Sequence, residues 1–189
     1  MGGVALFPAD TVYGLATEPD SREGVERLYR LKGRAPGQPS AVMFFRLELA
    51  LAALPELDGR LRGAVERLLP GALTLLLPNP DGRYPLACGP EPGRLGLRVP
   101  RLEGALGPLA RVSWPVLQSS ANPTGEADPR RVGDVDWRIR RGVDMVLDGG
   151  ELPGTASTVV DLSGYEDGGE WSVVREGAVP ASELAERLG

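Results

Sequence analysis

A lysine and an arginine stand two residues apart, as Lys32-Gly33-Arg34, at the end of a predicted helix. The chain contains 20 arginines but only this one lysine. A compact ammonium approaches a phosphate or carboxylate as a point charge, and a guanidinium contacts the same group through two parallel N–H donors. The pair therefore indicates a site for a phosphate tail. The alternative is that both cations stabilise the carboxyl end of the helix, which contributes about 0.3–1 kcal/mol.

Further polar groups follow predicted strands, where loops commonly carry function on a rigid scaffold. These groups lie at residues 10–14, 119–122, 155–158 and 175. Hydroxyls and amides at such positions suit recognition of a ribose, a base or a phosphate. Each group also has a structural explanation. Asn122 can cap the turn before Pro123, the hydroxyls of residues 155–158 suit a strand, and Arg175 can be a surface cation.

The elements that must position these groups mix strands and helices without strict alternation. Short apolar runs predict strands near residues 4–7, 41–45, 73–77, 95–99, 116–118, 143–147, 157–162 and 171–175. Apolar residues at helical spacing predict helices at 21–32, 48–54, 58–69 and 182–188, the first capped by Ser21 and ended by Gly33. We expect turns at residues 8–15 and 167–169. The sequence therefore predicts one α/β domain over residues 1–189, with a twisted mixed sheet flanked by helices.

Composition excludes several kinds of site. The chain has no histidine, which excludes imidazole catalysis and histidine-bound zinc. Its one cysteine, Cys88, excludes an internal disulfide and a Cys-x-x-Cys site, and no P-loop motif is present. We expect no metal held by the protein itself. No run approaches the roughly 20 apolar residues that span a bilayer, and no signal peptide is recognisable, so we expect a cytoplasmic protein without membrane contact.

Seven segments occur in the order found in the YrdC/Sua5 family, which the chain resembles over nearly its whole length. They read PADTVYGL (residues 8–15), KGR (32–34), PGALT (70–74), LRVP (97–100), SANPTG (120–125), STVVD (157–161) and REGA (175–178). The resemblance implies a YrdC-like fold with a large concave cavity lined by positive charge. It also implies a nucleotidyltransferase, an L-threonylcarbamoyladenylate synthase. Such an enzyme converts L-threonine, bicarbonate and ATP, with Mg²⁺, to threonylcarbamoyl-AMP and pyrophosphate.

Matching positions imply a role for nine residues. Lys32 and Arg34 would bind the triphosphate and act in catalysis. The contacts with L-threonine would come from Thr11, Ser157 and Arg98, the last with the carboxylate. The remaining nucleotide contacts would come from Thr74, Ser120, Asn122 and Arg175. The chain departs from the family pattern at Ala9, Ala35, Ser40 and Met43, the last standing where some members carry a histidine.

The resemblance also implies a place in tRNA modification, since a downstream threonylcarbamoyl transferase would use the product. Two alternatives stay open. The cavity of this family also suits tRNA or double-stranded RNA, so the chain is alternatively an RNA-binding module without synthase activity. A net charge of −5 disfavours a mainly electrostatic nucleic-acid binder but leaves a local basic cleft possible. The second alternative is a carbamoyl-transfer enzyme with another acceptor.

Overall fold

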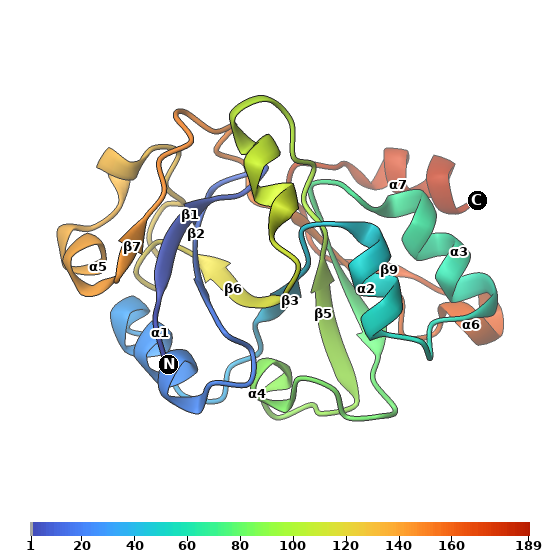
Figure 1. Cartoon of the computed structure of the whole chain (residues 1–189). Helices are drawn as coiled ribbons and strands as arrows, with labels where there is room; N and C mark the ends of the chain where they lie inside the picture. The colour runs from blue at the N-terminus through green and yellow to red at the C-terminus, as the bar shows by residue number, and fades with distance from the viewer. Residues whose placement is uncertain (1) are drawn as a thin grey trace.

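The computed structural model describes residues 2–189, in which nine strands form one mixed sheet (Figure 1). The strands are β1 (Ala5–Pro8), β2 (Tyr13–Thr17), β3 (Ala41–Met43), β4 (Leu73–Pro78), β5 (Arg94–Arg98), β6 (Val116–Ser120), β7 (Met145–Val146), β8 (Thr158–Asp161) and β9 (Ser172–Arg175). Their order across the sheet is β7-β1-β2-β6-β3-β5-β4-β8-β9. Three pairs are parallel, β1 with β7, β3 with β5 and β4 with β8, and the others are antiparallel. The predicted mixed sheet is therefore confirmed.

Helices flank both ends of this twisted sheet (Figure 1). They are α1 (Arg22–Lys32), α2 (Leu47–Ala53), α3 (Gly59–Leu68), α4 (Pro85–Cys88), α5 (Trp137–Gly142), α6 (Tyr165–Gly168) and α7 (Ala181–Leu188), with 3₁₀ turns η1 (Gly104–Arg111) and η2 (Val132–Asp134). α1 and α5 lie beside the β1–β2 end, whereas α2, α3, α6 and α7 lie beside the other end. None of the described helices combines the length and apolar character needed to cross a bilayer.

α1 begins and ends where the sequence predicts. The Ser21 hydroxyl accepts a hydrogen bond from the Gly24 amide at 3.2 Å, which satisfies one of the free donors at the helix start. Gly33 adopts a left-handed conformation with φ of 59°, and its N–H closes onto the last turn. Leu28 and Tyr29 on the apolar face are buried against the sheet. The helix therefore delivers Lys32 to the sheet in a fixed position.

Apolar residues pack on both faces of the sheet. The larger cluster joins the sheet to the helices and contains Leu28 and Leu75. The smaller cluster lies on the other face and consists of Phe7, Ala9, Ala16, Met43, Phe45 and Val116. Met43 is fully buried there, between Val116 and Arg98 in the sheet register. Ala9 and Met43, two departures from the family pattern, therefore belong to the core.

Two local predictions are wrong. Residues 8–15 do not form one turn, because β2 begins at Tyr13 and pairs with β1 on one side and β6 on the other. Residues 167–169 do not form a hairpin turn. One turn of helix, α6, connects β8 to β9 and ends at Gly169, which is left-handed with φ of 74°. In both places, pairing and packing that the local pattern does not contain decide the conformation.

Gly24, inside α1, tests how closely this helix packs on the sheet, and Gly63, inside α3, serves as the control. A Cβ at Gly24 would lie 2.1 Å from the Thr17 hydroxyl, whereas a Cβ at Gly63 would meet only the flexible end of Arg67 at 3.2 Å. We expect Gly24→Ala to lower the free energy of unfolding by about 1–3 kcal/mol through overpacking. The matched variant Gly63→Ala should raise it by about 0.5–1 kcal/mol, because alanine favours a helix. Urea denaturation measures both, and equal effects would contradict the close packing.

Candidate functional site

A cavity of about 330 Å³ opens where the end of α1, the end of β6 and the strands β4, β8 and β9 approach one another. Eight of the nine residues that the sequence singles out line it: Lys32, Arg34, Thr74, Arg98, Ser120, Asn122, Ser157 and Arg175. They come from segments up to 143 residues apart, from Lys32 to Arg175. The structure thus brings these residues together, while their individual roles stay predictions.

Lys32 joins α1 to the end of β6. Its ammonium donates to the Asn122 carbonyl at 2.7 Å, to Asn122 Oδ1 at 3.1 Å and to the Ser120 carbonyl. The Ser120 hydroxyl donates to Asn122 Oδ1 at 2.6 Å. The Thr124 amide in turn donates to the Lys32 carbonyl at 2.9 Å. Lys32, Ser120 and Asn122 therefore form one hydrogen-bonded group at the cavity wall, which agrees with their predicted common location.

The charge on Lys32 is compensated only weakly. Burial lowers the pKa of its ammonium from the usual 10.5 to about 8, and repulsion by Arg34 adds to this shift. Attraction by Asp128, another residue of the cavity wall, acts in the opposite direction but is the smallest of the three causes. Carbonyl dipoles rather than a carboxylate hold this cation. An anionic ligand would therefore meet a positive charge that no carboxylate has neutralised.

Arg34 lies beside Lys32 and is fixed at all three of its nitrogens. Nη1 donates to the Ser119 hydroxyl at 3.0 Å, Nε donates to Gln38 Oε1 at 3.1 Å, and Nη2 donates to the Pro39 carbonyl. The guanidinium also lies over the ring of Tyr29, 5.6 Å from its centroid. Burial lowers the pKa of Arg34. Two cations thus face one end of the cavity.

Arg98 lines the floor of the cavity and is paired with a carboxylate. Its Nη2 lies 2.9 Å from Asp10 Oδ1, and both side chains are almost completely buried. Nη1 donates to Gln118 Oε1 at 3.3 Å, whereas Nε is buried and has no hydrogen-bond partner among the described residues. Burial raises the pKa of Asp10 and lowers that of Arg98, since both charged forms have lost water, while their mutual attraction opposes both shifts.

Thr74, Ser157 and Arg175 form a third group, across β4, β8 and β9. The hydroxyls of Thr74 and Ser157 are 2.9 Å apart, and Arg175 Nη2 donates to the Ser157 carbonyl at 2.7 Å. The sheet register explains this grouping, because Thr74 pairs with Val159 and Val159 pairs with Arg175. The resemblance assigns Thr74 and Arg175 to the nucleotide, but the structure places them beside Ser157, the predicted amino-acid contact.

Thr11 does not line the cavity. Only 1% of it is exposed, and its hydroxyl accepts a hydrogen bond from Arg98 Nη2 at 3.2 Å. In this structure Thr11 supports Arg98 from behind, so the expected direct contact with a substrate stays a prediction. Its neighbour Val12 lines the cavity instead.

The cavity wall also contains Ser119, which belongs to the predicted polar group at 119–122 but was assigned no role, and it contains Gln118 and Asp128, which sequence reasoning missed. Gln118 and Ser119 belong to β6, so the strand prediction for 116–118 and the polar group at 119–122 were signals for them. Asp128 lies in a loop and carries no such signal. Among the described residues, no three His, Cys, Asp or Glu side chains gather closely enough to hold a metal ion.

The sequence profile of the Sua5/YciO/YrdC family, described as "Telomere recombination", matches residues 1–177. The chain belongs to this family. The curated relatives include the threonylcarbamoyl-AMP synthase of Pyrococcus abyssi, 30% identical over 100% of this chain and 54% of the relative. The threonylcarbamoyl-AMP synthase of Bacillus subtilis is 31% identical over 85% of this chain and 46% of the relative. The chain therefore spans about half the length of these two curated relatives.

Solved structures of the family share the fold. P. abyssi Sua5 complexed with L-threonine matches with a TM-score of 0.80 and 26% identity, over 100% of this chain and 54% of the other. E. coli YciO matches with a TM-score of 0.77 and 26% identity, over 97% of this chain and 87% of the other. The predicted α/β fold of this family, with one large twisted sheet, is thus confirmed.

The lowered pKa of Lys32 predicts how anion binding depends on pH. Lys32 is protonated below about pH 8 and loses its charge above it. We expect the dissociation constant for ATP to rise by up to about tenfold per pH unit between roughly pH 8 and pH 10, because ATP phosphates are already fully ionised there. In Lys32→Met this rise of the dissociation constant with pH should be absent. Calorimetric titration at several pH values measures it, and a flat wild-type profile would contradict the lowered pKa.

Proposed function

We propose that this chain carries L-threonylcarbamoyladenylate synthase activity, forming threonylcarbamoyl-AMP and pyrophosphate from L-threonine, bicarbonate and MgATP. The observation that supports this most is the division of one cavity into two chemically different halves. Lys32 and Arg34 supply two closely spaced positive charges in one half. Hydroxyls and two more arginines, one of them paired with Asp10, line the other half. Relatives that match 100% and 85% of this chain are named threonylcarbamoyl-AMP synthase.

The half with Lys32 and Arg34 suits the triphosphate. Lys32 has three N–H donors, and all three have acceptors within the protein. A phosphate oxygen would therefore replace one of these acceptors rather than occupy a free donor. Arg34 would contribute a planar guanidinium and a second charge. Together with Mg²⁺ carried by ATP, these cations would offset the charge that develops on the leaving pyrophosphate.

The other half suits an amino acid. The Thr74–Ser157 pair presents two hydroxyls, each able to donate and to accept. Arg98 and Arg175 provide guanidinium groups for a carboxylate. L-threonine fits this set because it brings one carboxylate and one hydroxyl. The complex of P. abyssi Sua5 with L-threonine supports the same assignment.

The proposed reaction needs no protein nucleophile. The threonine amine would add to bicarbonate with loss of water, giving a carbamate. A carbamate oxygen would then attack the α-phosphorus of ATP, and the bond to the β-phosphate oxygen would break to release pyrophosphate. The protein would act by alignment and by charge neutralisation, since both reacting groups are anions. No histidine is required, in keeping with the composition.

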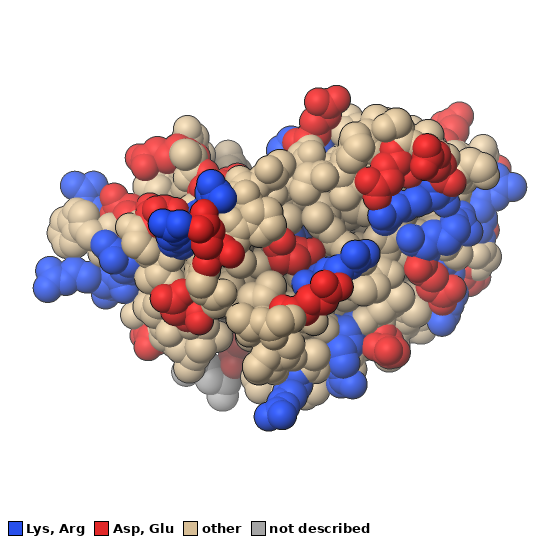
Figure 2. All heavy atoms as spheres, turned by 90° about the horizontal axis from the view of Figure 1, so that it is seen from above, with Lys and Arg blue, Asp and Glu red and all other residues tan. Residues whose placement is uncertain are grey.

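In the cell we propose a cytoplasmic location and transfer of the product to tRNA by a downstream threonylcarbamoyl transferase. The RNA-binding alternative has less support than the synthase. The face seen in Figure 2 carries interspersed acidic and basic side chains rather than one continuous basic surface. Salt-dependent RNA binding without threonine-dependent ATP turnover would favour that alternative. Stimulation by carbamoyl phosphate instead of bicarbonate and threonine would favour carbamoyl transfer.

Pyrophosphate release from ATP and bicarbonate, measured with and without L-threonine, tests the synthase proposal. We expect release to depend on threonine, and Lys32→Ala to abolish it. Lys32→Arg should also lose most activity, because a planar guanidinium does not match the three acceptors that converge on a compact ammonium. Arg30→Ala is the control, since Arg30 is an exposed cation in the same last turn of α1. Near-normal release by either Lys32 variant would refute its assigned role.

The hydroxyl pair predicts the amino-acid preference. We expect kcat/KM with L-valine to be at least about a hundredfold below that with L-threonine, because the isosteric valine cannot exchange a hydrogen bond with the Thr74–Ser157 hydroxyl pair. L-serine should lose less, since the missing methyl group costs about 1–3 kcal/mol. Ser157→Ala should reduce the discrimination against valine. Equal stimulation by valine and threonine would show that the cavity does not recognise the hydroxyl.

A further inference from the structure

Residues 36–40, which follow Arg34 closely in the sequence, separate two cavities, and we call this segment the wall. On one side, Gln38, Pro39 and Ser40 line the cavity of the candidate site. On the other side, Pro36 and Gly37 line a separate crevice of about 510 Å³ between α1 and α4. Two of the three hydrogen-bonding nitrogens of Arg34 contact this wall, at Gln38 and Pro39. The position of Arg34 therefore depends on what holds the wall in place.

α4 and the glycine that follows it support the wall from outside the cavity. The Ser40 amide donates to the Ala87 carbonyl of α4 at 2.8 Å. Gly89 lies directly against the wall, since a Cβ there would be 2.4 Å from the Gly37 carbonyl oxygen and 2.9 Å from the Pro39 nitrogen. Gly89 also has a positive φ of 62°. This close backbone contact requires glycine at position 89.

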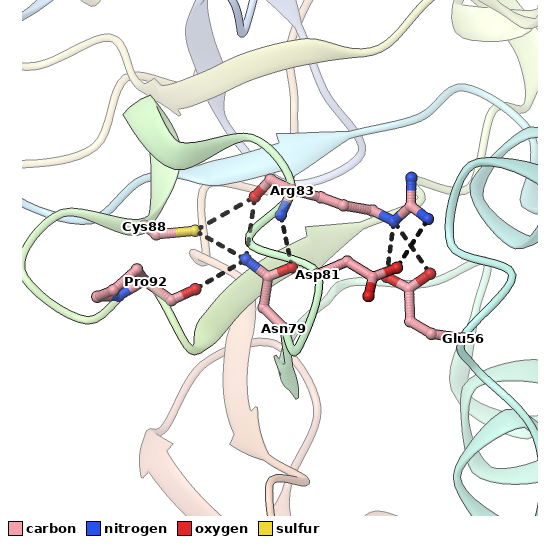
Figure 3. Close-up of polar contacts among 6 residues, drawn as sticks. All are labelled: Glu56, Asn79, Asp81, Arg83, Cys88 and Pro92. Carbon is pink, nitrogen blue, oxygen red and sulfur yellow. Dashed lines mark hydrogen bonds and ion pairs between the residues drawn. The ribbon is translucent and has the colours of Figure 1, made fainter.

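α4 is itself fixed by a buried asparagine (Figure 3). Asn79 accepts a hydrogen bond from the Arg83 amide at 2.9 Å, and its Nδ2 donates to the carbonyls of Arg83 at 3.0 Å and Pro92 at 2.9 Å. Nδ2 also lies 3.4 Å from the sulfur of Cys88, the last residue of α4. The side-chain amide thus holds three separate points of the loop between β4 and β5, which keeps a four-residue helix in one position.

The start of α4 has two further attachments. Arg83 pairs with Glu56 at 2.9 Å, which joins the loop to the segment between α2 and α3. Tyr84 has a φ of 50°, the one positive value among the described residues other than glycine. Its ring meets Phe44 edge to face, with the centroids 6.2 Å apart. Burial of this ring against Phe44 offsets the cost of the left-handed backbone.

We propose that the segment from Asn79 to Gly89 positions Arg34, and that Gly89 thereby sets the affinity of the cavity for a polyphosphate. None of these residues except Arg34 has to touch the ligand. Asn79 fixes α4, α4 and Gly89 fix the wall, and the wall presents acceptors to two nitrogens of Arg34. This inference rests on the proposed function only in taking ATP as the natural polyphosphate, because the positioning itself applies to any such anion.

Calorimetric binding of inorganic triphosphate tests the inference separately from catalysis. We expect Gly89→Ala to raise the dissociation constant about tenfold or more, since displacement of the wall misplaces one of two cations. Gly82→Ala is the matched control. Gly82 lies in the same loop with φ of 61°, but a Cβ there would meet nothing within 4 Å. Gly82→Ala therefore also places a side chain at a positive φ but away from residues 36–40, and triphosphate affinity should stay within about twofold of wild type.

A double-mutant cycle separates positioning from general damage. In an Arg34→Ala background, Gly89→Ala should cause no further loss of triphosphate affinity, because the residue through which it acts is gone. Additive losses would overturn the inference. Gln38→Ala adds a variant at an exposed position that folds readily, and it removes the acceptor of Arg34 Nε. We expect it to weaken triphosphate binding about threefold to tenfold.

The outcomes distinguish the two proposals. Wild-type affinity in Gly89→Ala or in Gln38→Ala would overturn the positioning of Arg34, whatever the enzymatic activity. Triphosphate binding with the expected pattern of variants, but without threonine-dependent pyrophosphate release, would overturn the synthase activity and support the positioning. Failure of the wild-type protein to bind triphosphate would overturn both.

Discussion

The ammonium group of Lys32 joins the end of α1 to the end of β6, and the cavity depends on this contact. Two backbone carbonyls and one side-chain amide converge there, and an ammonium with three donors satisfies them together. A buried carbonyl left without a donor costs about 1–3 kcal/mol. The same contact keeps a positive charge at the cavity wall. One group of atoms therefore closes the structure and supplies the charge, which explains why the single lysine of the chain stands here among 20 arginines.

The basic side chains of the cavity differ in which groups balance their positive charge. The charge of Arg98 is matched by the buried carboxylate of Asp10, so this pair adds directed donors and little net charge. Lys32 and Arg34 are held by backbone carbonyls, one hydroxyl and two side-chain amides, which orient them without cancelling their charge. Arg175, at the other end of the cavity, is likewise held by the Ser157 carbonyl, so positive charge lies at both ends even though the chain is acidic overall, with a net charge of −5.

Local sequence signals predicted the elements whose start, apolar face and end are all encoded within one segment. α1 is an example, because its Ser21 cap, apolar face and terminal Gly33 all lie within the segment. β2 was misread because two of its five residues are Gly14 and Ala16, and its strand character comes from pairing with β1 and β6. The nearest partners of Thr74 also depend on strand pairing. They are set by the order of strands across the sheet, which no periodicity along one segment contains, and they put Thr74 beside Ser157. The nucleotide contact that the resemblance implies for Thr74 stays a prediction.

The large separation along the chain between Lys32 and its partners has a consequence for biosynthesis. Residues 120 and 122 follow Lys32 by 88 and 90 positions, so this contact is long-range. The half of the cavity with Lys32 cannot close until β6 has left the ribosome. The half with Thr74 waits longer still, because Ser157 and Arg175 lie further along the chain, just before β8 and at the end of β9. An emerging chain would thus acquire its two ligand surfaces in a fixed temporal order, the phosphate-facing one first.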